Sequence, residues 1–276
     1  MVEILKAVLF GVVEGITEWL PISSTGHMIL LNEFVKLEVS PQFWEMFLVV
    51  IQLGAILAVV MLYWNRIFPF EIGGSEIIRK DVFAMWGKVI VGCLPAVIIG
   101  LPFDDTFEAL FYNYQTVAVA LIVFGIAFIL IENRKKKQQP RINSIAEMSV
   151  QTAFIIGIFQ LIAGIFPGTS RSGSTIVGAL LLGVSRTAAA EFTFFMAIPV
   201  MFGASLLKIV KYLLEGMTLG VSEWSILLIG CVVAFFVSVF AIKFLMGYIQ
   251  KNNFKVFGWY RIVLGALVLL YFGIIA

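Results

Sequence analysis

The sequence is poor in charge, cysteine and histidine. Lys, Arg, Asp and Glu make up only 13% of its 276 residues, against about 25% in an average soluble domain. The net charge is +2, which is too small for a global basic field, so we expect no nucleic-acid partner. The two cysteines, Cys93 and Cys231, lie in apolar runs without a redox or metal motif. They are therefore expected to be small buried hydrophobes.

Long apolar runs take the place of the missing charge. Hydrophobic residues form 61% of the chain, and several runs reach the roughly 20 residues that a helix needs to cross a bilayer. Runs such as "VAVALIVFGIAFILI" are apolar on every face, unlike the alternating strands of a membrane barrel. We predict an all-α integral membrane protein with six transmembrane helices, near residues 43–64, 83–101, 115–132, 187–213, 223–248 and 256–275.

Two further apolar regions, 2–36 and 147–184, are interrupted by "LPISSTGH" and "FPGTSRSGST". Pro21 and Pro167 cannot continue the helix that they end, and the Ser, Thr and Gly that follow are good caps for a second helix. Irregular polar backbone is tolerated at membrane depth only where protein or a watery cavity surrounds it. We therefore expect two re-entrant helix-loop-helix hairpins. The first has no small-residue cleavage site, so we expect it to be retained.

The two interrupted regions are similar to one another at an offset of 146 residues (157 minus 11). Each half would hold one hairpin and three spans, and an odd number of crossings makes the second half enter from the opposite side. We expect a single membrane domain, 1–276, built as an inverted-topology repeat of 1–132 and 142–276 around a basic linker, 133–141. The matched pairs are Gly11 and Gly157, Glu14 and Gln160, Pro21 and Pro167, Ser23 and Thr169, Ser24 and Ser170, Thr25 and Arg171, and Glu45 and Glu191.

The distribution of basic residues predicts the orientation. The linker "NRKKKQQPR" is the densest basic run, and such runs face the cytoplasm. Both termini would then lie outside, the hairpins would enter from opposite sides, and their tips would meet near the middle of the membrane. We expect the site at these tips to open toward the outer, periplasmic face of a bacterial inner membrane.

The first hairpin contains two carboxylates and a cluster of hydroxyls. Glu14 and Glu18 stand four residues apart on one helix face, where like charges disfavour ionising both. The pair suits proton transfer, or a divalent cation such as Mg²⁺ or Ca²⁺; two polar residues at a helix interface are the structural alternative. We expect no organic cofactor.

Beyond Pro21, Ser24 is the candidate nucleophile at a helix start that can bind an anion. His27, the only histidine, could protonate a leaving group, orient the nucleophile, or serve only the structure. The neighbours expected to cap the helix or contact phosphate are Ser23, Thr25 and Gly26.

The second hairpin carries Arg171 in the middle of an apolar region. Its planar guanidinium binds phosphate or carboxylate well. It could pair with Glu14 or Glu18 across the repeat, or extend toward the membrane surface as a structural residue. The glycines in this loop allow close backbone approach, and the hydroxyls add hydrogen-bonding groups. The loop residues expected to bind substrate are Gly168, Thr169, Ser170, Ser172 and Gly173.

"EGITEWLPISSTGH" and "PGTSRSGST" together resemble the signature motifs of the bacterial undecaprenyl-diphosphate phosphatases, a family associated with bacitracin resistance. The resemblance extends over the whole chain. It implies an enzyme that removes the terminal phosphate of undecaprenyl diphosphate and so recycles the lipid carrier of cell-wall precursors. It also implies that Glu14, Glu18, Ser24, His27 and Arg171 are the functional residues.

Two other functions are alternatives to the phosphatase. A polyprenyl-phosphate flippase would also use an inverted repeat with an anion site at midplane, but binding alone needs no nucleophile and base. A membrane scaffold would explain neither the duplicated loops nor Arg171. On the phosphatase interpretation the partners are a polyprenyl diphosphate substrate and membrane lipids, with a homodimer left open.

Overall fold

The structure is a computed structural model that describes residues 1–71, 77–135 and 139–275. Residues 136–138 of the expected basic linker lie outside these ranges. The described residues form helices, turns and two isolated backbone bridges. The helices are α1 (Val2–Thr17), α2 (Ser24–Phe34), α3 (Pro41–Leu62), α4 (Trp64–Ile67), α5 (Lys80–Pro95), α6 (Asp104–Phe111), α7 (Tyr114–Lys135), α8 (Val150–Ile165), α9 (Arg171–Leu181), α10 (Arg186–Leu214), α11 (Val221–Lys251) and α12 (Lys255–Leu270).

Six helices among the described residues are long and apolar enough to cross a membrane, as predicted. One is longer than expected. The helical path does not stop at Pro95, the last residue of α5, because it continues as a π-helical turn, Ala96–Gly100. A short 3₁₀ turn then leads into α6, so the apolar helix runs from Lys80 to Phe111. Proline has no N–H to donate within the helix, and a π turn can absorb the resulting irregularity without ending the helical path.

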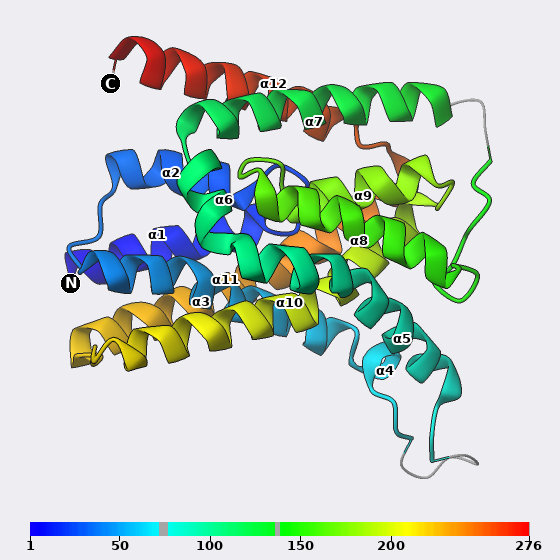
Figure 1. Cartoon of the computed structure of the whole chain (residues 1–276), viewed down its shortest axis with the longest axis horizontal. Coiled ribbons are helices and arrows are strands. Elements are labelled where there is room, and N and C mark those ends of the chain that lie inside the picture. The colour runs from blue at the N-terminus through cyan, green and yellow to red at the C-terminus, as the bar shows by residue number, and fades with distance from the viewer. Residues whose placement is uncertain (72–76, 136–138, 276) are drawn as a thin grey trace.

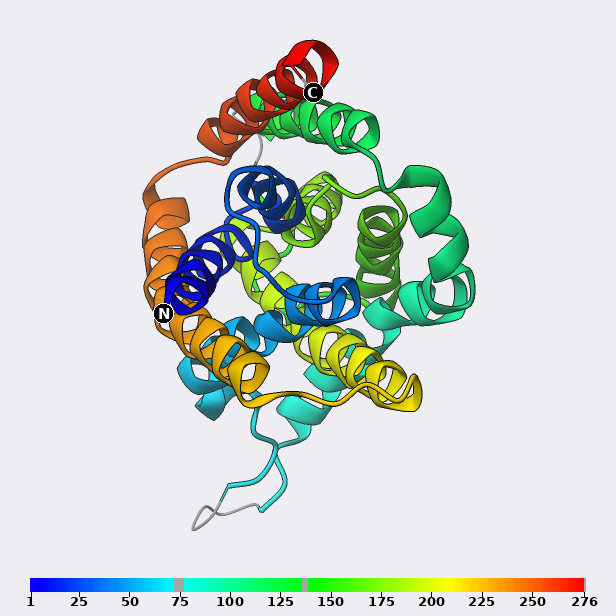
Figure 2. The ribbon, with the colours of Figure 1, turned by 90° about the vertical axis from the view of Figure 1, so that its left-hand side faces the viewer.

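The two interrupted regions each form helix, turn and helix. α1 and α2 come from the end of the molecule that holds the N-terminus, whereas α8 and α9 come from the opposite end (Figure 1). Figure 2, viewed along the long helices, shows α2 and α9 inside a ring that includes α7, α10, α11 and α12. The two turns, 18–23 and 166–170, therefore lie inside the protein, where side chains can satisfy their backbone.

The turns end in the same way but differ in length. Ser23 and Ser170 both have positive φ angles, 76° and 68°, which is uncommon for residues other than glycine. Each hydroxyl accepts a hydrogen bond from a glycine N–H three residues later. These caps are 147 residues apart. At the caps, Ser23 therefore corresponds to Ser170 and Ser24 to Arg171, and the predicted pairs Ser23/Thr169, Ser24/Ser170 and Thr25/Arg171 are each shifted by one residue. The stretch from the proline to the capping serine is one residue longer in the second turn, and contains Gly168 at φ 90°.

The hairpins pack against helices of the other half of the chain. α1 lies on α11, and α8 lies on α5. Glycines make both contacts close: a Cβ at Gly11 would lie 2.8 Å from the Gly230 carbonyl oxygen, and one at Gly157 would lie 2.2 Å from that of Gly92. Helix backbones that approach this closely are typical of membrane proteins, in which small residues form the helix interfaces.

Ion pairs join α3 to α10 and the neighbouring α4 to α10. Glu45 lies 3.7 Å from the Lys208 ammonium, and Arg66 holds Glu191 through two hydrogen bonds of 2.5 and 3.0 Å. The two carboxylates are the pair that the 146-residue offset relates. Ion pairs therefore hold α10 to α4 near its start and to α3 near its end.

The contact at Gly157 yields a stability test. Gly157→Ala should lower the thermal unfolding midpoint in detergent, at a cost on the order of 1–3 kcal/mol, because α5 and α8 must separate. The matched control is Gly87→Ala in α5, where a Cβ meets nothing within 4 Å; it should gain about 0.5–1 kcal/mol from helix propensity. Equal midpoints for the two variants would contradict the close contact.

Candidate active site

The two turns meet through Glu18 and Arg171. An Nη2 of Arg171 lies 2.6 Å from Oε1 of Glu18, and the Ser172 hydroxyl donates to the Glu18 carbonyl oxygen at 3.1 Å. Both charged side chains are largely buried, with 15% and 7% of their area exposed. Of the partners that the sequence left open for Arg171, the structure selects Glu18. A buried ion pair of this kind joins two segments that are 153 residues apart.

Glu18 also accepts a hydrogen bond from the candidate nucleophile. The Ser24 hydroxyl donates to Oε2 of Glu18 at 2.7 Å, which leaves Oε1 for Arg171. An activated nucleophile is typically a hydroxyl that is hydrogen-bonded to a base, with a third group orienting the base. Arg171 is oriented in turn by the Thr193 carbonyl oxygen, 3.2 Å from its Nη1. The three predicted residues therefore form one connected unit.

Glu14 lies one helical turn before Glu18 and is 1% exposed. Its Oε1 atom has no hydrogen-bond partner among the described residues, and neither have the side-chain amide of Gln160 and the hydroxyl of Thr169. Buried polar atoms are nearly always paired, so an unpaired one indicates a place for water, an ion or a ligand. Glu14 lines a cavity together with Ser24 and Thr25.

His27 is fixed at both ring nitrogens. Nδ1 lies 2.7 Å from the Ser23 carbonyl oxygen, and Nε2 lies 2.6 Å from the Tyr260 hydroxyl. In the neutral ring Nδ1 donates to the carbonyl and Nε2 accepts from the tyrosine. The rings of His27 and Tyr260 also stack at 5.6 Å. These contacts suit the orienting role among those considered for His27, since they hold the residue that caps α2.

The remaining predicted loop residues hold the turns in shape. The Gly26 and Gly173 N–H groups donate to the capping hydroxyls of Ser23 and Ser170. Ser170 and Ser172 share a hydrogen bond of 3.2 Å between their hydroxyls. Gly168 lies against α7, because a Cβ there would come within 2.5 Å of the Val117 carbonyl oxygen. An anion bound by these turns would therefore meet a backbone whose shape is already fixed by internal hydrogen bonds.

Arg261 is the residue that the sequence analysis missed. It lies on α12 and is fully buried. Its guanidinium donates to the carbonyl oxygens of Pro21 at 3.2 Å, Gly168 at 3.0 Å and Thr169 at 2.7 Å. One side chain thus binds the backbone of both turns. The signal was available in the sequence, since Arg261 is a single arginine inside the apolar run 256–275, where charge is rare and functional.

Two adjoining cavities, which together we call the polar cleft, lead to Ser24. One, of about 420 Å³, is lined by Glu14, Ser24 and Asn32 among others. The other, of about 510 Å³, is lined by charged residues that include Glu45, Asp104 and Lys208. The cavities share Thr25, Trp44, Leu48, Val49 and Tyr112. Water and a charged group can therefore approach Ser24 through this cleft.

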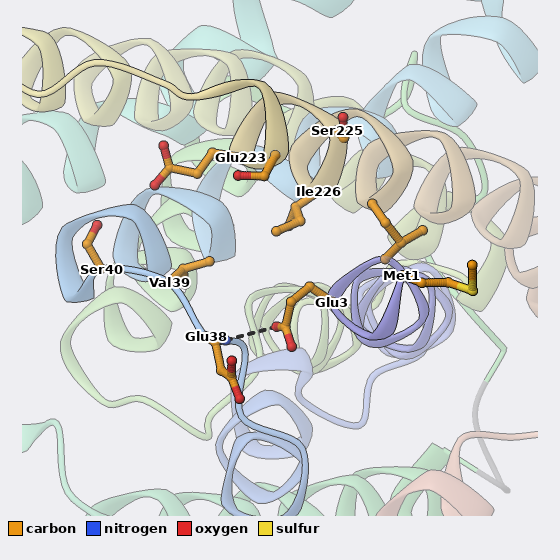
Figure 3. Close-up of a pocket in the computed structure, with 10 residues that line it drawn as sticks. Met1, Glu3, Glu38, Val39, Ser40, Glu223, Ser225 and Ile226 are labelled. Atoms are coloured by element: carbon orange, nitrogen blue, oxygen red, sulfur yellow. Dashed lines mark hydrogen bonds between the residues drawn. The ribbon is translucent and has the colours of Figure 1, made fainter.

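A separate cavity of about 710 Å³ lies beside the N-terminus (Figure 3). Three carboxylates line it, but two of them already have partners. Glu3 accepts from the Lys6 ammonium at 2.6 Å and the Glu38 N–H at 2.9 Å, and Glu223 accepts from the Gly220 N–H. The bond from Lys6 is the main reason that the pKa of Glu3 lies below its usual value. This cavity contains none of the predicted site residues.

Within residues 1–71, 77–135 and 139–275, no three His, Cys, Asp or Glu side chains gather closely enough to hold a metal by themselves. Any cation at the candidate site would depend on the two carboxylates of α1 and its turn, together with oxygens from a ligand.

The fold and the site define a multi-pass helical membrane protein with a buried carboxylate, serine and arginine unit at the meeting point of two capped turns. The chain belongs to the BacA family: residues 7–267 match the family described as bacitracin resistance protein BacA. It is 66% identical over 272 residues to the undecaprenyl-diphosphatase of Desulfitobacterium hafniense, covering 99% of this chain and 97% of the relative.

Further relatives carry the same name. Undecaprenyl-diphosphatase 1 of Clostridium acetobutylicum is 63% identical over 274 residues, and the match covers 99% of both chains. The undecaprenyl-diphosphatase of Enterococcus faecalis is 56% identical over 266 residues, or 96% of both chains. The resemblance identified from the two motifs is confirmed.

The clamp made by Arg261 can be tested by removing its donors. Arg261→Met should lower the free energy of unfolding by about 3 kcal/mol or more, because carbonyl oxygens of both turns lose their partners in a buried place. Arg261→Lys should recover only part, since an ammonium lacks the planar fork. Lys255→Met on the same helix is the control. Thermal unfolding in detergent measures the effect, and an Arg261→Met midpoint equal to the control would refute the clamp.

Proposed function

We infer that this chain is a membrane phosphatase that hydrolyses undecaprenyl diphosphate to undecaprenyl phosphate and inorganic phosphate. This conclusion rests on the two contacts of Glu18: one carboxylate oxygen accepts a hydrogen bond from the Ser24 hydroxyl, and the other pairs with Arg171. A nucleophile, a base and a phosphate-binding cation thus meet at one point. The names of the relatives, which match nearly the whole chain, support the same substrate.

In this mechanism the terminal phosphate enters through the polar cleft and takes the place of Glu18 as the partner of Arg171. The guanidinium and the N–H groups at the starts of α2 and α9 stabilise the negative charge on the phosphoryl oxygens. Glu18, released from the ion pair, accepts the proton of the attacking group. That group is Ser24 or a water molecule.

Attack forms a new P–O bond and breaks the bond between the terminal phosphorus and the bridging oxygen. The overall reaction consumes one water and leaves undecaprenyl phosphate and inorganic phosphate. His27 keeps the start of α2 in place through Ser23 and Tyr260. It therefore acts as a positioning residue in this proposal, without contacting the reacting atoms.

A divalent cation fits the acidic side of the site. Glu14 offers a buried oxygen without a partner among the described residues, and Mg²⁺ is commonly held by one or two carboxylates with the rest of its ligands from substrate phosphates and water. We propose that Glu14, with help from Glu18, holds Mg²⁺ or Ca²⁺. Such an ion would neutralise charge on the diphosphate. Arg171 and the capped turns bind the phosphate oxygens on the other side.

The architecture is proposed to be an inverted repeat with re-entrant hairpins. Three features support it: the hairpins come from opposite ends (Figure 1), α1 packs on α11 as α8 packs on α5, and Glu45 and Glu191 form corresponding ion pairs. The predicted orientation puts Arg66, Arg79, Arg186 and Lys255 at one end and Asp104 and Glu108 at the other, where Lys208 lies beside them as an exception. By the positive-inside rule the polar cleft would open to the periplasmic side of the inner membrane.

Phosphate release tests the function directly. Purified protein should free phosphate from undecaprenyl diphosphate, and both Arg171→Ala and Glu18→Ala should lower kcat about 10²–10³-fold, because each removes a charged group that acts in the transition state. Arg141→Ala, an exposed arginine outside the turns, is the matched control and should keep wild-type activity. Protein that binds the lipid and frees no phosphate would refute the enzyme and favour a flippase.

Removal of divalent cations tests the role of Glu14. Chelation should abolish phosphate release, and Mg²⁺ or Ca²⁺ should restore it. Glu14→Gln should raise the cation concentration for half-maximal activity by roughly 10–100-fold, since an amide binds these ions more weakly than a carboxylate. The control is Glu33→Gln, which lines the polar cleft farther from the turns. Full activity in the chelator would overturn the proposed cation.

A further inference from the structure

A short two-stranded ribbon lies between α4 and α5. Phe70 and Ile78 form an antiparallel bridge, and backbone hydrogen bonds of 3.0 and 2.9 Å close it on either side. The described residues of this α4–α5 ribbon are 68–71 and 77–79. At its base the Trp86 indole N–H donates to the Ile67 carbonyl oxygen at 2.7 Å. The ribbon therefore has a fixed position beside the start of α5.

The ribbon has one wholly apolar face. Successive side chains of a strand point to opposite faces, and directly paired residues share a face. The apolar face holds Phe68, Phe70 and Ile78, and the other, mixed face holds Pro69, Glu71, Ile77 and Arg79. On the apolar face, Phe70 and Ile78 are about half exposed, 46% and 50%. An isolated two-stranded ribbon is marginally stable in water, so this face needs a covering that the described residues do not supply.

The apolar face belongs to an aromatic row that runs from α4 to α5. Trp64 stacks on Phe68 with ring centroids 4.6 Å apart. Phe70 contacts both Phe68, at 5.8 Å, and Phe83 of α5, at 6.1 Å. Phe83 is exposed and opens the apolar stretch of α5, only 33% of which is buried within the protein. The apolar face of the ribbon is therefore continuous with a helix surface that faces lipid.

The ribbon extends sideways from the long helices at one end of the molecule. In Figure 1 it leaves α4 and α5 at an angle to those helices. In Figure 2, viewed along them, the same segment lies outside the ring. A segment that extends sideways where membrane-crossing helices end runs along the membrane surface. Lys80, the exposed first residue of α5, lies at this level, where lipid phosphates are found.

We propose that the α4–α5 ribbon binds the interfacial region of the adjoining lipid leaflet. Its apolar face lies against the start of the acyl chains, its mixed face lies toward the headgroups, and the Lys80 ammonium donates to a lipid phosphate. Aromatic side chains are favoured at this depth. The partner is phospholipid and not a second protein, because the apolar face continues the lipid-facing surface of α5. This assignment is independent of the reaction proposed above.

Nitroxide labels on the two faces test this arrangement in nanodiscs. The label is attached through Ile78→Cys or, as the matched control on the mixed face, Glu71→Cys, in protein that also carries Cys93→Ala and Cys231→Ala. The label from Ile78→Cys should lie roughly 5–10 Å below the lipid phosphates, the depth of amphipathic helices at the interface. Oxygen should relax it more than a water-soluble nickel complex does. The label from Glu71→Cys should lie above the phosphates and show the reverse.

Two results of this experiment would overturn the assignment. Equal and high accessibility to nickel at both positions would place the apolar face in water. A label from Ile78→Cys that neither oxygen nor nickel reaches would mean that protein covers the face, such as a second copy of this chain.

A measurement on the unmodified chain removes the dependence on these variants. Cleavage after Arg66 and Arg79 releases residues 67–79, which contain the ribbon and no part of a membrane-crossing helix. A phospholipid with a photoreactive group on the first carbons of its acyl chain should label this peptide in nanodiscs of wild-type protein. The peptides of α5 and α7 serve as the internal control. Label on those helices without label on 67–79 would refute the proposal.

Discussion

The buried guanidinium of Arg261 is the contact on which the site depends. Two non-helical turns inside an apolar helical protein present carbonyl oxygens that no helix satisfies, and each such oxygen is costly when left without a donor. Arg261 supplies donors to both turns at once. It thereby fixes the distance between segments from the two halves of the chain. The Glu18–Arg171 pair can form only because the turns are already held beside each other.

The division of chemistry between the two turns follows from this clamp. The first turn carries the acid and the hydroxyl, and the second carries the cation. Ser23 and Ser170 take the same strained cap position, so the residue after each cap, Ser24 or Arg171, points into the same small region. A similar local structure in both hairpins thus presents a hydroxyl from one side and a guanidinium from the other. Strained residues of this kind are concentrated at functional sites.

The sequence by itself determined the helical membrane class, the six long helices and the two interrupted regions, because hydrophobic run length and proline are local signals. It also marked Glu14, Glu18, Ser24 and Arg171, since polar groups in apolar runs stand out. Only the tertiary structure decided that Arg171 pairs with Glu18, that one more residue separates the proline from the cap in the second turn, and that Arg261 holds both turns. The contacts of Arg171 and Arg261 join segments 92 to 240 residues apart, and the free energy of such contacts is not encoded in any local pattern.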